Sequence, residues 1–350
     1  MLKFKVIKNS YAKLGIEDSK HLIYQGFNWR NEKEKWGAWH KINSNSIHKK
    51  SCFDVEYKSN NIGARDEKDY FKNKIIKNSI VLLGDSFAEG YGIDFPHTFA
   101  SLLEKETQRP VFNFGSAYNF GPLQYYLIYK NLAKNYKHET LVIFFLPSND
   151  FIDNDPKLIK KFPERYRPYY LSNKEEKIFT FKYPKDAVKR ETIKINILGK
   201  NVEAILFKSS AYKIYKNLLL TANNNVGDVR NRARWYFHSE FNREGVLYYL
   251  EELINEARKN NVKETLLFAI PSLQEIELFK TNDADPYKVE WVKYLKNLDS
   301  KLENFTFLNG FDYLNINHKK YKKYFLKCDP HWSEEGHIWA KDVIRRNLKD

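Results

Sequence analysis

Three segments that lie far apart in the sequence carry residue types that could perform acyl transfer. Ser86 follows the apolar run at 80–83 in VLLGDSFAEG, Asn149 follows another apolar run in LPSNDF, and His331 stands two residues after Asp329 in CDPHWSEEGH. A serine hydroxyl is a weak nucleophile at neutral pH unless a base removes its proton. A neutral imidazole is such a base, a carboxylate can orient it, and an amide can donate to a developing oxyanion.

Each of these residues also has an ordinary structural explanation. A serine after a strand can be a turn or cap residue, Asn149 suits an Asx-turn, and a histidine before a helix can simply be packed. We expect Asp150 to brace its loop rather than react, and His337 to be packed or exposed rather than catalytic. The chemical interpretation therefore depends on whether the fold gathers the three segments.

Short apolar runs and helical patterns alternate on both sides of these segments. Strands are expected at 80–83, 111–114, 141–146, 264–270 and 305–308, and helices at 97–107, 124–135, 243–260, 287–301 and from an N-cap at Ser333 to about 347. This alternation predicts an α/β fold, a doubly wound, flavodoxin-like parallel five-stranded sheet. Because the carboxyl ends of parallel strands share one edge, the loops with Ser86 and Asn149 should meet there, close to the loop with His331.

Two regions depart from the alternation. Residues 1–75 are polar and aromatic, and we expect them to form an N-terminal extension that covers the sheet edge. Residues 156–240 are rich in Lys, Arg and Tyr and are expected to form a cap insertion, with a hairpin around 177–206 and a helix around 209–222. The cap could bind an acceptor sugar by stacking and charge pairing, or it could only complete the core. The two halves of the α/β domain would then be 76–155 and 241–350.

The composition narrows the class of protein. With 42% hydrophobic and 16% aromatic residues, the 350-residue chain can bury a sizeable core. The formal net charge of +15 suits an anionic partner, but the abundance of Lys, Asn, Ile, Tyr and Phe also follows from AT-rich codons. No zinc-finger, RRM or basic-zipper pattern occurs, so no nucleic-acid partner is expected.

The termini and cysteines carry further expectations. The N-terminus lacks a signal-peptide pattern, and the apolar run at 141–147 is too short to span a bilayer, so a cytoplasmic protein with no transmembrane segment is expected. Cys52 and Cys328 are the only cysteines, from which we expect no disulfide framework and no cysteine-based metal site. No cofactor is expected. A weaker alternative is a metal site formed by Asp329, His331 and His337. The oligomeric state is not specified by the sequence.

The blocks VLLGDSFAEG, NFGSAYNFGPLQ, LPSNDF and DPHWSEEGH resemble those of the SGNH/GDSL hydrolase family, over roughly 76–155 and 241–350. The resemblance implies the SGNH hydrolase fold, with Ser86 as the nucleophile, His331 as the base and Asp329 as its acid partner. The implied oxyanion hole combines the Ser86 N–H, the Asn149 side chain and one backbone N–H of the second block, from Tyr118, Asn119 or Gly115.

This sequence departs from the family pattern at several positions. The acid stands two residues before the histidine rather than three, and Phe87 follows the serine where small or hydroxyl residues are usual. Five positions after Asn113 stands Tyr118 in place of glycine, which restricts the backbone there. The segment 53–70 resembles a stretch that precedes the serine block in some bacterial members. Within it, we expect Arg65 to pair with a carboxylate rather than reach the site.

The residues and the resemblance together favour a serine esterase or deacylase acting on ester-linked small acyl groups of a carbohydrate or lipid through an acyl-serine intermediate. One alternative is an O-acyltransferase that modifies a surface glycan or its precursor. Another is a non-catalytic glycan-binding protein on a hydrolase scaffold. In each case the partner is a small-molecule or glycan ester, and the basic charge would suit an anionic one.

Overall fold

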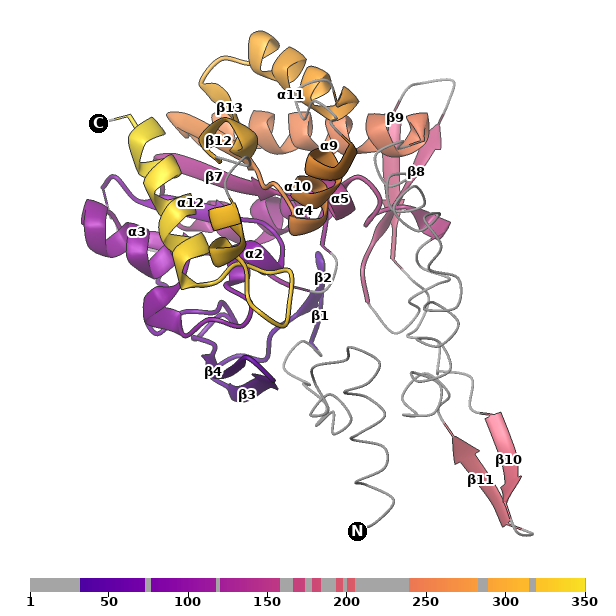
Figure 1. The fold of residues 1–350 in the computed structure, drawn as a ribbon. Coiled ribbons are helices and arrows are strands. Elements are labelled where there is room, and N and C mark those ends of the chain that lie inside the picture. Colours follow the sequence, from indigo (N-terminus) through magenta and orange to yellow (C-terminus); the bar gives the residue numbers. More distant parts are fainter. Residues whose placement is uncertain are drawn as a thin grey trace.

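A five-stranded parallel sheet forms the centre of the fold (Figure 1). The structure is a computed structural model that describes residues 32–72, 77–117, 120–157, 166–173, 178–183, 193–197, 200–204, 239–282, 289–314 and 319–349. The strands of the central sheet are β5 (Ile80–Leu83), β6 (Val111–Asn113), β7 (Thr140–Phe145), β12 (Glu264–Ala269) and β13 (Phe305–Asn309), in the spatial order β13-β12-β7-β5-β6. Numbered along the chain, this is the order 2-1-3-4-5, so the predicted flavodoxin-like sheet is confirmed.

The two strands at the middle of the site edge, β5 and β7, form in runs that are almost entirely apolar. Every residue of β5 and β7 is buried, as is typical of parallel strands covered on both faces. The register pairs Leu82 with Val142 and Leu83 with Ile143, so β5 and β7 end at nearly the same level. The topological switch point lies between these two strands, because the chain winds outward from them in opposite directions.

Helices cover both faces of the sheet. On one face α3 (Phe99–Thr107) packs against the final helix α12 (Glu334–Asn347), and on the other α4 (Pro122–Asn131) packs against α9 (Glu240–Lys259), next to α11 (Glu290–Lys301) (Figure 1). The predicted N-cap of α12 is present, since the Ser333 hydroxyl accepts a hydrogen bond from the Gly336 N–H at 3.3 Å. The remaining helices are α10 (Leu273–Asn282), the short α2 (Ser86–Glu89) and α5 (Pro147–Asp150), and the 3₁₀ turns η2 (Phe95–His97), η3 (Ala133–Asn135), η7 (Gly310–Tyr313) and η8 (Lys319–Tyr324).

The described residues also form four antiparallel hairpins. They are β1 (Glu32–Glu34) with β2 (Gly37–Trp39), β3 (Asn45–Lys50) with β4 (Phe53–Lys58), β8 (Tyr169–Asn173) with β9 (Ile178–Lys182), and β10 (Ile193–Ile197) with β11 (Lys200–Ala204). The hairpin expected around 177–206 is present only in part: β10–β11 lies within that range, whereas β9 pairs with β8, which begins before it. The helix expected at 209–222 lies outside the described residues. The division into an extension, a cap and two halves stays a prediction.

Part of the insertion belongs to the core. Tyr170 of β8 is fully buried, and its hydroxyl donates a hydrogen bond to the Asn242 carbonyl of α9 at 3.2 Å. Gly245 leaves the room that the Tyr170 ring occupies, since a Cβ there would lie 2.8 Å from ring atoms. The β8–β9 hairpin is thus packed against α9.

The two cysteines, from which no disulfide framework was expected, are bonded to each other. Cys52 lies in the two-residue turn between β3 and β4, and Cys328 lies in the loop before α12, with their Cα atoms 5.7 Å apart. The bond joins segments separated by 276 residues. Sequence spacing gave no sign of this pairing because the tertiary fold alone brings the hairpin to that loop.

None of the helices in the described segments combines the length and the apolar character needed to cross a membrane.

Candidate active site

The fold brings Ser86, His331 and Asp329 together. The Nε2 atom of His331 lies 2.7 Å from the Ser86 Oγ atom, and its Nδ1 atom hydrogen-bonds to Oδ1 of Asp329. A carboxylate can only accept, so Nδ1 carries the proton and the unprotonated Nε2 faces the hydroxyl. Ser86 is partly exposed and the His331 side chain is 20% exposed, so a small molecule can reach both.

Ser86 is placed by a tight turn from strand to helix. Gly84 has a φ of 153°, and a Cβ there would come within 2.8 Å of Ala88 and Phe144 side-chain atoms. The Asp85 carboxylate caps the next helix by accepting a hydrogen bond from the Phe87 N–H at 2.9 Å. Ser86 is thus the first residue of α2, where backbone N–H groups lack intrahelical acceptors. Its own N–H is therefore suited to an oxyanion, as the sequence resemblance implies.

The loop with His331 is fixed by both backbone and aromatic contacts. The His331 carbonyl accepts a hydrogen bond from the Leu326 N–H at 2.8 Å, and the His331 N–H donates to Asp329 Oδ1 at 3.1 Å. The next residue, Trp332, is buried edge-on against Phe87 with ring centroids 4.9 Å apart. The Phe87 ring also lies 5.0 Å from the imidazole. The bulky residue after the serine therefore packs the base loop onto α2.

Asp329 keeps its charge although it is mostly buried. Burial alone would raise the pKa of this carboxyl group, but the hydrogen bond with His331 and the charge of Lys50 hold the pKa well below its ordinary value. The Nζ atom of Lys50 forms an ion pair with Asp329 Oδ2. The carboxylate is thus ionised at neutral pH and can stabilise an imidazolium.

The groups expected to donate to the oxyanion have different hydrogen-bond partners in the structure. The Nδ2 atom of Asn149, in α5 just after β7, donates to Asp153 Oδ2 at 2.9 Å, and the Asn149 side chain also hydrogen-bonds to the Asp85 carboxyl group. The Gly115 N–H already donates to the Asn113 side chain at 2.8 Å. Tyr118 and Asn119, the other two candidates of the second block, lie outside the described residues.

A group of buried acids lies behind the nucleophile. Burial, together with the nearby charge of Asp153, raises the pKa of Asp85 to about 7, against a lowering by the Phe87 N–H. Burial and the charges of Asp85 and Asp153 raise the pKa of Asp150 well above its ordinary value. Asp150 accepts hydrogen bonds from the Leu146 N–H at 2.9 Å and the Tyr125 hydroxyl at 3.1 Å, so it braces its loop.

His337 and Arg65 support the site from behind. The buried His337 accepts a hydrogen bond from the Phe99 N–H at 3.1 Å, and burial with the charges of Arg65 and His331 lowers its pKa to about 3. It is packed and neutral. Arg65 lies over the Tyr57 ring and donates to the carbonyls of Glu89, Gly90 and Ile93. The first two carbonyls lie at the carboxyl end of α2 and the third in the turn that follows, so Arg65 fixes the helix that begins with Ser86.

Within the described part of the chain, no three His, Cys, Asp or Glu side chains are placed to hold a metal ion. Asp329, His331 and His337, the alternative metal ligands, do not form such a group.

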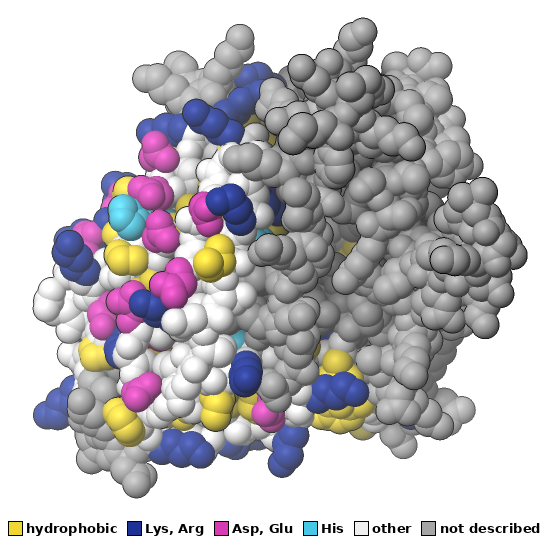
Figure 2. Space-filling view, turned by 90° about the horizontal axis from the view of Figure 1, so that it is seen from below, with side chains coloured by type: hydrophobic (Ala, Val, Ile, Leu, Met, Phe, Trp, Pro, Cys, Tyr) yellow, Lys and Arg dark blue, Asp and Glu magenta, His cyan; other side chains and the backbone are white. Residues whose placement is uncertain are grey.

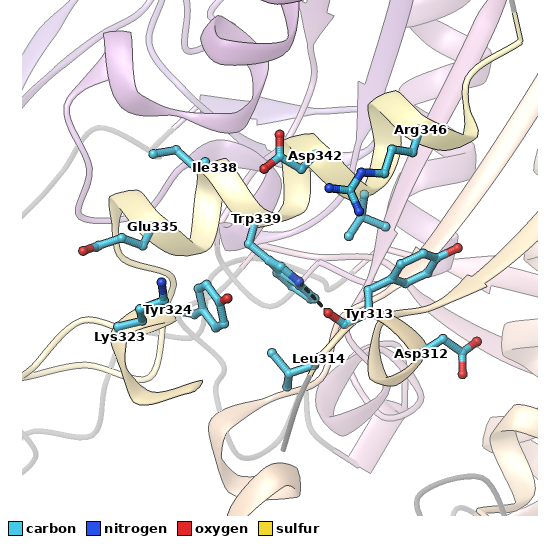
Figure 3. A pocket seen from close by; sticks show the side chains of 11 residues that line it. Asp312, Tyr313, Leu314, Lys323, Tyr324, Glu335, Ile338, Trp339, Asp342 and Arg346 are labelled. Carbon is cyan, nitrogen blue, oxygen red and sulfur yellow. Dashed lines mark hydrogen bonds between the residues drawn. The ribbon is translucent and has the colours of Figure 1, made fainter. Parts of the chain in front are cut away.

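A hollow of about 650 Å³ lies along α12 (Figure 3). Tyr313, Tyr324 and Trp339 line it together with charged side chains, and the Trp339 N–H is used in a hydrogen bond to the Tyr313 carbonyl at 3.1 Å. Neither Ser86, His331 nor Asp329 contributes to its wall. It is therefore separate from the site described above.

Comparison with known proteins gives likenesses of fold. No family model matches the chain, and no curated protein matches its sequence. A solved structure described as a lipolytic protein of the G-D-S-L family, from Desulfitobacterium hafniense, is 13% identical, with 78% of this chain and 100% of that chain covered and a TM-score of 0.41. A lipase/acylhydrolase from Enterococcus faecalis is 14% identical over 77% and 94% of the two chains, with a TM-score of 0.40.

A carbohydrate esterase family 2 enzyme from Corynascus thermopiles is 12% identical, covering 78% of this chain and 66% of that chain, with a TM-score of 0.39. The likeness to these hydrolases is one of fold. At these low sequence identities, the reaction that this chain catalyses has to be inferred from the geometry of its own site.

Two residues at the site were missed from the sequence. Lys50 reaches Asp329 from the β3–β4 hairpin, and the Tyr91 ring stacks on His331. One signal was available for Lys50. The only two cysteines lie two residues after Lys50 and one before Asp329, so pairing them would have brought the two charges together. No comparable signal marked Tyr91.

Proposed function

We propose that the protein is a serine esterase that removes a small acyl group from an ester through an acyl-serine intermediate. The observation that carries this proposal is the 2.7 Å contact between Ser86 Oγ and His331 Nε2, with the other imidazole nitrogen bonded to Asp329. Serine, base and orienting acid stand in the relation that nucleophilic catalysis requires. The resemblance of the four sequence blocks to SGNH/GDSL hydrolases supports the same chemistry.

In the first half of the reaction, His331 Nε2 takes the Ser86 proton as Oγ attacks the ester carbonyl carbon. The carbonyl oxygen becomes an oxyanion, which the Ser86 N–H stabilises, with the Asn149 amide as the proposed second donor. The bond between the carbonyl carbon and the alcohol oxygen then breaks. The leaving alcohol takes the proton from Nε2, and the acyl group remains on Ser86.

In the second half, a water molecule attacks the acyl-serine while His331 accepts its proton. The bond from the carbonyl carbon to Oγ breaks, and the proton returns to Ser86 as the acid is released. Asp329 stays ionised throughout and stabilises the imidazolium formed in both halves. Its low pKa ensures the charge at neutral pH.

The test is to compare the parent with Ser86→Ala in the hydrolysis of an activated acetyl ester and in labelling by a fluorophosphonate. We expect Ser86→Ala to lower kcat by about 10⁴-fold or more and to abolish labelling, because it removes the nucleophile. Ser300→Ala is the matched control, since Ser300 is exposed and hydrogen-bonds only locally to the Asn297 carbonyl. An unlabelled parent, under conditions that label a known serine esterase, would contradict the proposal and favour a binding protein on this scaffold.

The acyl acceptor is tested with the same protein. We propose a carbohydrate ester as the substrate, because aromatic and basic residues are frequent in the insertion at 156–240. An acetyl donor is supplied with and without neutral and anionic glycans, and acetate and acetylated sugar are measured. Release of acetate from an acetylated glycan supports the esterase, whereas transfer of the acetyl group onto added sugar would identify an O-acyltransferase.

A further inference from the structure

The Asp329 carboxylate is shared between two donors, the neutral imidazole of His331 and the ammonium group of Lys50. Oδ1 bonds to His331, and Oδ2 forms an ion pair with Nζ of Lys50, the last residue of β3. The Asp329 side chain is 7% exposed and the Lys50 side chain is 21% exposed. Because water has little access, this pair is screened far less than an ordinary surface ion pair. Lys50 therefore fixes the orientation of the carboxylate that orients the base.

Tyr91 holds the imidazole from a second direction. Its ring is stacked on the His331 ring, with centroids 4.1 Å apart and an interplanar angle of 23°. Its N–H donates to the Ser86 carbonyl at 3.0 Å, so the stacking residue is tied to the helix that carries the nucleophile. Glycines on both sides adopt positive φ, 83° at Gly90 and 75° at Gly92, and this double turn delivers the ring to the imidazole.

Lys50 and Tyr91 also contact each other. The Lys50 Nζ atom lies 5.3 Å from the centroid of the Tyr91 ring, within the range of a cation–π interaction. Burial lowers the pKa of Lys50, but Tyr91 and Asp329 outweigh burial and raise it above its ordinary value. Lys50 is therefore a permanent cation at neutral pH.

The β3–β4 hairpin is anchored where these contacts occur. The Tyr57 hydroxyl accepts a hydrogen bond from the Gly92 N–H at 2.6 Å, and the His48 ring meets the Tyr91 ring at 4.6 Å. The disulfide of Cys52 binds the turn of the hairpin to the residue before Asp329. In Figure 1 the hairpin lies below α2, on the same side as the yellow loop that leads into α12. The hairpin is thus attached to both the nucleophile helix and the base loop.

We propose that Lys50 and Tyr91 are positioning residues that act as one brace, which keeps Asp329 and His331 aligned with Ser86. This inference rests on the proposed serine chemistry. It gives the β3–β4 hairpin, which lies outside the sequence blocks with Ser86, Asn149 and His331, a role in catalysis. Lys50 acts through Asp329, and Tyr91 acts by restricting rotation of the imidazole plane. Neither residue takes up or releases a proton in the reaction.

The charge of Lys50 affects how the reactivity of Ser86 depends on pH. The titratable groups that face His331 are Asp329 on its own loop, Tyr91 after α2, Lys50 on the hairpin and the buried His337 on α12. Of these, Lys50 is the positive charge that competes with the imidazolium for Asp329. Without it, the carboxylate would stabilise the imidazolium more strongly, and the unprotonated base would be available only at higher pH.

The experiment measures the rate constant of fluorophosphonate labelling of Ser86 from pH 5 to 9 in Lys50→Met, Lys50→Arg and the control Lys49→Met. Lys49 is the neighbouring residue on the hairpin, 57% exposed and paired with Asp54 of the opposite strand. We expect Lys50→Met to label about tenfold more slowly, with the acidic limb of its profile moved to higher pH. Lys50→Arg should keep the limb at its parental position, and Lys49→Met should match the parent throughout.

Tyr91 is tested by Tyr91→Phe, which keeps the ring, and Tyr91→Leu, which removes it. We expect Tyr91→Phe to stay within about threefold of the parent, and Tyr91→Leu to fall about tenfold. If the two residues act as one unit, Lys50→Met with Tyr91→Leu should lose less than the product of the two single losses. The folded fraction of each variant, measured by circular dichroism, is used to correct its labelling rate constant for partial unfolding.

Two outcomes separate this inference from the proposed function. If the parent is labelled at Ser86 but Lys50→Met has the same rate constant and the same acidic limb as Lys49→Met, the brace is overturned and the esterase stands. If the parent is not labelled at all, both fall. A slower Lys50→Met whose acidic limb is unmoved would also overturn the charge argument, because that pattern belongs to a purely structural residue.

Discussion

Two aspartates near the nucleophile illustrate how environment decides protonation. Asp329 is mostly buried, but it has Lys50 and His331 as partners, and its pKa is held low. Asp85 is fully buried and shares its surroundings with the carboxylate of Asp153, so its pKa rises to about 7. The same side chain is therefore an ionised partner of the base in one place and a helix cap that takes up a proton near pH 7 in the other.

The raised pKa of Asp85 predicts a pH-dependent stability. In the unfolded chain this carboxyl group ionises near pH 4, and in the folded chain near pH 7. Between these values the folded state binds the extra proton, so the contribution of Asp85 to stability is present below about pH 4 and is lost as the pH rises through about 7. Asp85→Asn keeps an acceptor for the Phe87 N–H without the charge. We expect it to be more stable than the parent at pH 8, with a smaller difference at pH 5.

Urea denaturation at the two pH values measures this difference. Asp94→Asn is the control, because Asp94 is exposed and its side chain makes no cap hydrogen bond. A difference between Asp85→Asn and the parent that is the same at pH 5 and pH 8 would mean that Asp85 ionises in the folded protein as it does in the unfolded chain.

For single residues, the sequence predicted the placement of those that follow strands of the central sheet. It did not predict the placement of residues that approach the site from other elements. Ser86 and Asn149 come directly after β5 and β7, and parallel strands bring such positions to one edge. Lys50 belongs to a hairpin about 280 residues away along the chain from Asp329, and only tertiary contacts bring the two together. For Gly115, the Asx-type hydrogen bond to Asn113 that uses its N–H was equally invisible in the sequence.

Among the elements, the buried strands were predictable and the hairpins were not. β5 has the predicted bounds, because four consecutive apolar residues buried on both faces leave no other interpretation. In β3, by contrast, only His48 is buried, so NSIHKK carries almost no hydrophobic pattern. Its pairing with β4 depends on a few inward residues such as Val55 and Tyr57. The element that carries Lys50 is therefore the one that periodicity could least reveal.

The disulfide is the element-scale feature with the clearest consequence. It closes a loop of 276 residues, and cross-links of this kind restrict the unfolded chain. Reduction should lower the free energy of unfolding by about 2–5 kcal/mol. Urea denaturation with and without a thiol reductant measures the loss. Since disulfides are rare in cytosolic proteins, the bonded pair also weighs against the cytoplasmic location expected from the sequence.

The control for this prediction is the double variant Cys52→Ser with Cys328→Ser. It should unfold at the same urea concentration as the reduced parent and should not respond to the reductant. If the oxidised and reduced parents share one midpoint, the bond either does not form in solution or does not restrict the unfolded chain.

At the scale of the whole molecule, the question is what the excess of positive charge does. The formal net charge is +15 at pH 7. On the face shown in Figure 2, the Lys and Arg side chains of the described segments are interspersed with Asp and Glu rather than gathered into one patch. A dispersed charge gives no specific site for an anion, but its total still attracts anions over a distance of the order of the Debye length.

This long-range attraction predicts a salt effect that depends on substrate charge. Raising the ionic strength from about 0.01 M to about 1 M shortens the Debye length from about 30 Å to about 3 Å. We expect kcat/KM for an acetyl ester with a carboxylate on its alcohol to fall several-fold over this range, because salt removes the attraction between the ester and the basic protein. A neutral ester with the same acyl group should change little. Equal responses of the two esters would mean that the positive charge plays no part in substrate capture, and that codon usage is the better explanation of the lysine content.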